Sequence, residues 1–161
     1  MNFRDTLAFR NRNPLNMRYS RNQTWEGQIG ESGGFVKFKE FYYGYRAAVI
    51  VLRNYKKRGI RSIYKIISTW APPNENDTGA YIKTVVDFMK GRWGTEPREY
   101  DAKTLINLCD REEVVNFLMA MTKVEMGANG AQLHMLKSDI EWGYDKAVSS
   151  KGFFTDVNKF F

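Results

Sequence analysis

Helical spacing dominates the chain from about Glu40 onward. Tyr45, Val49 and Leu52 follow one another at intervals of three and four residues, and Gly59 ends the run. Residues at this spacing lie on one face of an α-helix. The pattern therefore predicts a long amphipathic helix that begins near Glu40 and ends before Gly59.

Capping residues divide the rest of the chain into further helices. Helix N-caps are usually Ser, Thr, Asp or Asn, and glycine commonly follows the last turn, as Gly91 and Gly127 would here. The residues that fit the N-cap positions are Ser62, Asp77 or Thr78, Asp101 and Asp110. The helices predicted in this way cover residues 62–70, 78–90, 101–108, 110–126 and 132–148.

The first 38 residues have a different pattern. Three short, partly alternating segments are separated by Ser, Asn and Gly turn signals, which is typical of strands in a small antiparallel sheet. These segments are residues 16–19, 24–28 and 34–38. With no internal repeat or linker, the whole is predicted to be a single α+β domain over residues 1–161, mostly helical with a small N-terminal sheet. The aromatic tail, residues 152–161, is expected to dock as a short edge segment.

Composition removes several classes of site. The chain of 161 residues has one cysteine, Cys109, and one histidine, His134, which is too few for a zinc site or a Cys/His catalytic pair. We expect no metal and no cofactor, and we expect Cys109 to be a small buried hydrophobe. The polar N-terminus does not fit a secretory signal, and no run reaches the roughly 20 apolar residues of a membrane span, so no membrane partner is expected.

Charge is concentrated in the first part of the chain. Residues 1–61 hold 13 Lys and Arg against 4 Asp and Glu, a net of +9, whereas residues 62–161 hold 12 against 14, a net of −2. A basic half points to a polyanion: a nucleic acid, an acidic membrane or an acidic wall polymer. Without a helix-turn-helix signature or an RNP-like aromatic strand, a nucleic-acid partner is not expected.

The end of the predicted helix 110–126 carries a candidate acid. Met121, Leu118 and Val114 lie four, seven and eleven positions before Glu125, on one apolar stripe. A carboxyl on that stripe is partly desolvated, which raises its pKa as a general acid for a glycosidic oxygen requires. The alternative is a charged residue at a frayed helix end that faces solvent.

The loop that begins at Trp70 is a candidate sugar-binding segment. Two prolines stiffen it, and it presents Glu75, Asn76 and Thr78 shortly before Tyr81. Stiff loops that carry aromatic and short polar side chains suit sugars, because ring faces stack and hydroxyl groups need fixed partners. The alternative is a connector between helices, in which Thr78 or the preceding aspartate is an N-cap and Trp70 belongs to the core.

The N-terminal segment offers a third group of polar side chains. Asn13, Asn16 and Arg18 surround an Asn-Pro turn signal, and a Trp25-to-Gln28 segment follows. Two interpretations stay open. These amides and the guanidinium face a ligand, or they hold the small sheet together.

In this order the segments resemble a family that is common in phages and prophages. Its members are often labelled virion structural proteins and are related to lysozyme-like lytic enzymes. The family pattern includes R-N-x-N-P-x-N-x-R, W-x-G-Q, F-x-x-F, G-x-R-A, Y-x-x-R-G and W-A-P-P-x-E-N-x-T-x-x-Y-I. The segments that match these motifs are residues 10–18, 25–28, 35–38, 44–47, 55–59 and 70–82.

The resemblance implies a lysozyme-like fold and peptidoglycan as the substrate. It makes Glu125 the general acid that protonates the oxygen between N-acetylmuramic acid and N-acetylglucosamine, with Glu75 as the alternative acid or a second carboxylate. Water held by Thr78, Asn76 or Glu75 would give a muramidase. Attack by the muramic 6-hydroxyl would instead give a lytic transglycosylase.

The residues beside Glu125 depart from the family pattern. The family usually has His-Glu-Asn-Gly here, whereas Val124 and Met126 flank Glu125 in this chain. The alternative function is therefore a non-catalytic virion or wall-binding module. With either function, the expected partners are peptidoglycan and other virion proteins, and the expected location is the virion or the host cytoplasm before release to the wall. The resemblance also implies a cleft lined by Arg18, Trp25, Gln28, Trp70 and Tyr81.

Overall fold

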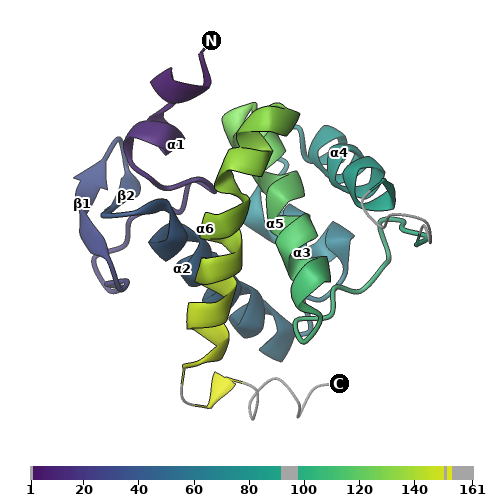
Figure 1. The fold of residues 1–161 in the computed structure, drawn as a ribbon. Helices are drawn as coiled ribbons and strands as arrows, with labels where there is room; N and C mark the ends of the chain where they lie inside the picture. The colour runs from purple at the N-terminus through teal and green to yellow at the C-terminus, as the bar shows by residue number, and fades with distance from the viewer. Residues whose placement is uncertain (1, 92–97, 151, 154–161) are drawn as a thin grey trace.

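One long helix forms the centre of the molecule. In the computed structural model, which describes residues 2–91, 98–150 and 152–153, α5 (Arg111–Met126) is buried at every position from 113 to 122. Around it lie α2 (Phe41–Lys57), α3 (Ile63–Trp70), α4 (Thr78–Lys90) and α6 (Gly130–Val148) (Figure 1). A helix that is mostly apolar and buried on all sides has to be enclosed by others, and this accounts for its central place.

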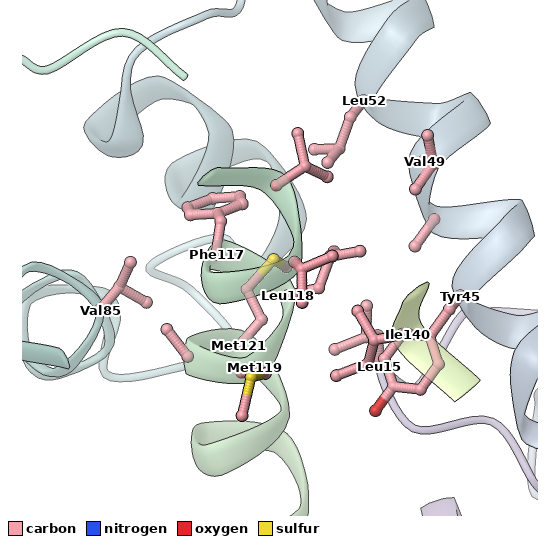
Figure 2. Close-up of a cluster of buried hydrophobic side chains, with 14 of the residues drawn as sticks. Leu15, Tyr45, Val49, Leu52, Val85, Phe117, Leu118, Met119, Met121 and Ile140 are labelled. Carbon is pink, nitrogen blue, oxygen red and sulfur yellow. The ribbon is translucent and has the colours of Figure 1, made fainter. Parts of the chain in front are cut away.

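The main hydrophobic core packs on both sides of α5. Val85 of α4 lies on one side, and Val49 and Leu52 of α2 lie on the other (Figure 2). The buried hydroxyl of Tyr45 is 2.8 Å from that of Thr122, so these two polar groups of the core are paired with each other. Packing on both sides fixes the direction of α5 and thereby the place of its last turn.

The N-terminal part adds short helices and a hairpin. η1 (Phe3–Asp5) and α1 (Leu7–Arg10) precede an antiparallel pair, β1 (Gln28–Ser32) and β2 (Phe35–Phe38). The α+β class, mostly helical with a small antiparallel sheet near the N-terminus, is thus confirmed. The strand predicted at 34–38 is β2. The segment 24–28 is largely turn, and 16–19 contributes an isolated bridge between Arg18 and Phe35.

Helix caps explain why the helical predictions succeed. The side chains of Ser62, Asp77 and Asp110 accept hydrogen bonds from backbone N–H groups three residues on, each at 3.1 Å. These bonds satisfy donors that the first turn leaves unpaired. Gly127 ends α5 with φ of 63°, a left-handed conformation that suits glycine.

The helix predicted over residues 101–108 is wrong. The carboxylate of Asp101 accepts from the N–H of Lys103 in a turn. The chain then pairs with the start of α3: the carbonyl of Thr104 accepts from the N–H of Ile63, and the N–H of Ile106 donates to the carbonyl of Arg61. Burial alternates there, so that Ile106 and Leu108 point inward while Cys109 is exposed. The prediction that Cys109 is buried is wrong for this reason, because a period of two replaces the helical one.

Most of the predicted edge segment at 152–161 lies outside the described residues, although Phe153 is buried. None of the described helices combines the length and apolar composition that crossing a bilayer requires.

Candidate functional site

A cleft of about 490 Å³ opens where α5 ends. Its walls come from α1, the segment that leads into the hairpin, β2, α2, and the end of α3 with the loop that follows it, and these surround the last turn of α5. Its lining residues are Thr6, Leu7, Ala8, Asn16, Met17, Arg18, Phe35, Val51, Tyr55, Trp70, Ala71, Glu75, Asn76 and Glu125. Its volume is within the range of small-molecule and substrate sites.

Glu125 lies in the last turn of α5 and reaches this cleft. Its side chain is largely withdrawn from water, and burial raises its pKa to about 7. A single hydrogen bond, from Nδ2 of Asn16 to Oε2 at 3.2 Å, opposes that rise because it stabilises the charged carboxylate. Glu125 is therefore poised to hold or release a proton near neutral pH.

Asn16 is held in place by the turn around it. Its φ of 52° is left-handed, a conformation that asparagine tolerates better than most residues. The buried amide of Asn13 braces this turn: its Nδ2 donates to the carbonyls of Met17 and Val36, and its Oδ1 accepts from the N–H of Met17, all at 2.9 Å. Asn13 is thus a structural residue of the site, and Asn16 is the one that faces the cleft.

The loop between α3 and α4 carries the second predicted carboxylate. Oε2 of Glu75 is 3.3 Å from a guanidinium nitrogen of Arg18, whose guanidinium also lies 5.3 Å from the ring centre of Phe35. This exposed ion pair joins the N-terminal segment to the α3–α4 loop. Such a pair contributes about 0–1 kcal/mol, so a charged ligand can displace it at little cost.

Trp70 serves both the core and the cleft. Its ring packs on the hydrophobic core, its indole Nε1 donates to the carbonyl of Leu15 at 3.2 Å, and part of its surface lines the cleft. Asn76 lines the cleft as well, while its Nδ2 donates to the carbonyl of Pro72 at 3.3 Å and so shapes its own loop.

Two residues of the predicted loop lie behind the cleft wall. Thr78 is buried, and its hydroxyl donates to the carbonyl of Ala71 at 2.6 Å, which fastens the start of α4. Tyr81 is 4% exposed, and its hydroxyl has no hydrogen-bond partner within the described part of the chain. Burial and the nearby charge of Glu125 raise the pKa of Tyr81.

Trp25 and Gln28 do not line this cleft. Trp25 packs on a small separate cluster that includes Met17, Val36 and Phe38. The side-chain carbonyl of Gln28 accepts from the N–H of Trp25 at 3.1 Å and closes the turn between them. For this segment, the structural interpretation fits the contacts better than ligand binding at the cleft.

Local sequence patterns do not mark Thr6, Phe35 and Tyr55, which also line the cleft. Thr6 caps α1, Phe35 begins β2, and Tyr55 belongs to the apolar stripe of α2. Each has a local structural role, and only the packing of α1, β2 and α2 around the end of α5 brings the three to one cavity.

The cleft therefore holds two carboxyl groups in different environments. Glu125 is desolvated and largely neutral below pH 7, whereas Glu75 is exposed and paired with Arg18. Pairs of carboxyl groups set apart in this way can divide the roles of acid and base. Across the described residues, no cluster of three or more His, Cys, Asp or Glu side chains is arranged to hold a metal ion.

Comparison with known proteins relates the chain to a phage protein. No protein-family model matches the chain. Protein P5 of Pseudoalteromonas phage PM2 is 34% identical over 142 residues, which cover 85% of this chain and 81% of that protein. Identity at this level over most of both chains indicates common descent. The chain therefore belongs to the family of the phage protein P5.

Proposed function

We propose that this phage-family protein cleaves the glycan strands of peptidoglycan, with Glu125 as general acid, on a lysozyme-like fold. The observation that carries the proposal is the raised pKa of Glu125 in a cleft that also holds a second carboxylate. A glycosidic oxygen needs a proton as its bond breaks, and a carboxyl with a pKa of about 7 still carries one at the pH of the host.

The contacts of Glu125 suggest how the proton is presented. Because Asn16 donates to Oε2, that atom acts as the acceptor and the proton of the neutral acid resides on Oε1. After transfer, the same bond stabilises the carboxylate that remains. Asn16 thus favours the state that follows proton donation.

Glu75 and Arg18 supply the rest of the proposed chemistry. A carboxylate of the wall polymer competes for Arg18 and releases Glu75 from its ion pair. The freed Glu75 then orients a water molecule and the protein acts as a muramidase. If no group orients water, the muramic 6-hydroxyl attacks and the protein is a lytic transglycosylase.

The second candidate function is binding of the wall polymer in the same cleft without cleavage. In a wall-binding module of the virion, Glu75 would remain paired with Arg18, and Trp70 would provide a surface for a sugar ring. The observation that favours this function is the flanking of Glu125 by Val124 and Met126, which offer the acid no polar side chain.

Digestion of purified sacculi, followed by mass spectrometry of the products, tests the proposal. Reducing-end sugars indicate hydrolysis, and 1,6-anhydro sugars indicate transglycosylation. Glu125→Gln should lower product formation at least about 100-fold, the usual contribution of a positioned general acid. Glu112→Gln is the matched control, because Glu112 is an exposed carboxylate at the other end of the same helix. Undiminished digestion by the Glu125→Gln variant would exclude Glu125 as the acid, and binding by the wild type without any product would favour the wall-binding module.

A further inference from the structure

An exposed aromatic stack lies on the surface formed by α2 and α6, outside the residues that line the cleft. The rings of Tyr42 and Trp142 are stacked, with centroids 5.1 Å apart and planes at 22°. Trp142 nevertheless remains 58% exposed. Tyr42 covers one face of the indole, and more than half of the Trp142 surface is open to solvent.

A glycine brings the two helices close enough for this stack. Gly143, next to Trp142, lies against the backbone of α2: a Cβ at this position would be 2.8 Å from both the carbonyl oxygen of Tyr42 and the amide nitrogen of Arg46. Without side-chain bulk here, α6 lies close against α2 (Figure 1). This approach sets the ring of Trp142 beside that of Tyr42. The exposed ring is thus placed by helix packing rather than by a loop.

Neighbouring groups hold the stack in one arrangement. The rings of Tyr42 and Tyr43 are 4.4 Å apart, and a hydrogen bond between their side chains raises the pKa of Tyr42 to about 12. The ammonium of Lys146 lies 5.9 Å from both tyrosine ring centres. A ring fixed before binding loses little conformational entropy when a ligand stacks on it.

The charges around the stack restrict its ligand. Glu26 is 3.0 Å from Arg46 and 4.0 Å from Lys146, and its charge, with that of Glu40, acts on Tyr42. The cations therefore face carboxylates rather than forming a basic surface. Nucleic acids need a basic groove along their phosphates, whereas the hydroxyl groups of a sugar can donate to carboxylates.

We propose that Tyr42 and Trp142 form a carbohydrate-binding surface, separate from the cleft, on which a sugar ring stacks against the exposed indole. A pyranose presents apolar C–H groups to the electron-rich face of an aromatic ring. The nearest cleft residue on the same helix, Val51, is nine positions from Tyr42, about 13 Å along the axis. While the cleft cleaves one glycan strand, this surface would hold a neighbouring part of the same polymer or an adjacent strand. The choice of peptidoglycan as that polymer rests on the proposed function.

Co-sedimentation with purified sacculi tests this surface. All variants would carry Glu125→Gln, so that cleavage does not remove the ligand. Trp142→Ala should raise the apparent Kd about three- to tenfold, the loss expected for one stacked ring. Trp142→Tyr, which keeps a flat ring, should retain most of the binding. Tyr64→Ala is the matched control, because Tyr64 is 57% exposed and lies at the start of α3, away from the stack.

The outcomes separate this surface from the proposed catalytic function. Equal binding by the Trp142→Ala and Tyr64→Ala variants would overturn the surface, even if the wild-type cleft releases sugar products from short soluble glycans. Two results together support the surface. Trp142→Ala weakens binding to sacculi in the Glu125→Gln protein, and the same substitution in the protein that retains Glu125 leaves the cleavage of short glycans unchanged. Loss of affinity for a single-stranded oligonucleotide but not for sacculi would overturn it in favour of base stacking. Thermal melting of each variant verifies that the fold is retained.

Discussion

The side-chain amide of Asn16 donates to Oε2 of Glu125 across 3.2 Å, although the two residues are 109 positions apart in the chain. This bond connects the turn after α1 with the last turn of α5. Burial raises the pKa of this carboxyl group to about 7, and the hydrogen bond from Asn16 acts to lower it. The balance between the two effects is the property of the cleft that experiments can vary most directly.

Replacing Glu125 should change how stability depends on pH. Its pKa is about 7 in the folded protein and near the ordinary 4.5 when unfolded, so the folded state binds the proton more tightly. The free energy of unfolding, relative to the Glu125→Gln variant, should be highest below pH 4.5. It should fall by about 3 kcal/mol as the pH rises through 7 and stay low above that. Chemical denaturation of both proteins at pH 4, 6 and 8 measures this difference, and a constant difference would show that Glu125 titrates normally.

Removing the Asn16 amide should raise the pKa of Glu125 further. We choose Asn16→Gly because glycine adopts the φ of 52° without strain, whereas alanine would not. If Glu125 is the acid, the alkaline limb of the activity profile should move to higher pH, since the acid stays protonated longer. Activity against sacculi between pH 5 and 9 shows the shift. A limb that stays in place would mean that the bond does not control the acid.

Asn13 should matter for folding rather than for chemistry. Its amide makes three hydrogen bonds of 2.9 Å inside the protein, so Asn13→Ala removes three bonds to buried backbone groups. We expect a loss of about 2–4 kcal/mol of stability. Asn13→Asp keeps the acceptor but loses the donor, so its stability should lie between those of Asn13→Ala and the wild type. Urea denaturation gives both values, and an effect under about 0.5 kcal/mol, the range of ordinary surface substitutions, would contradict the assigned role.

Gly143 should be intolerant of a side chain. A Cβ there would be 2.6 Å from Cβ of Tyr45 and 2.8 Å from backbone atoms of α2, so the helices must separate. Gly143→Ala should lose about 1–3 kcal/mol, as overpacked cores do. Gly130→Ala is the control on the same helix, because open space surrounds that position and alanine favours helices. Thermal melting of the two variants should differ clearly, and equal melting temperatures would argue against the close approach.

Local signals in the sequence were sufficient for most of the helices. Ser62, Asp77 and Asp110 each cap a helix through a bond to the third residue on, which depends only on nearby residues. The same kind of signal failed at Asp101. There the carboxylate closes a turn, and backbone pairing with the segment before α3 keeps the chain extended. A cap shows where a helix is able to begin, but tertiary partners decide whether one forms.

The sequence by itself determined the α+β class, the apolar stripe that places Glu125 at the end of a buried helix, and Trp70, Glu75 and Asn76 as one stiff loop. Only the tertiary structure decided which polar side chains meet. It set Asn16 against Glu125 and paired Arg18 with Glu75, yet turned Asn13 and Thr78 to backbone partners and left Trp25 and Gln28 away from the cleft. The reason is physical: a helix stripe is fixed by periods of a few residues. A cleft, in contrast, is formed where five separate segments pack around one helix end, and no local pattern records that packing.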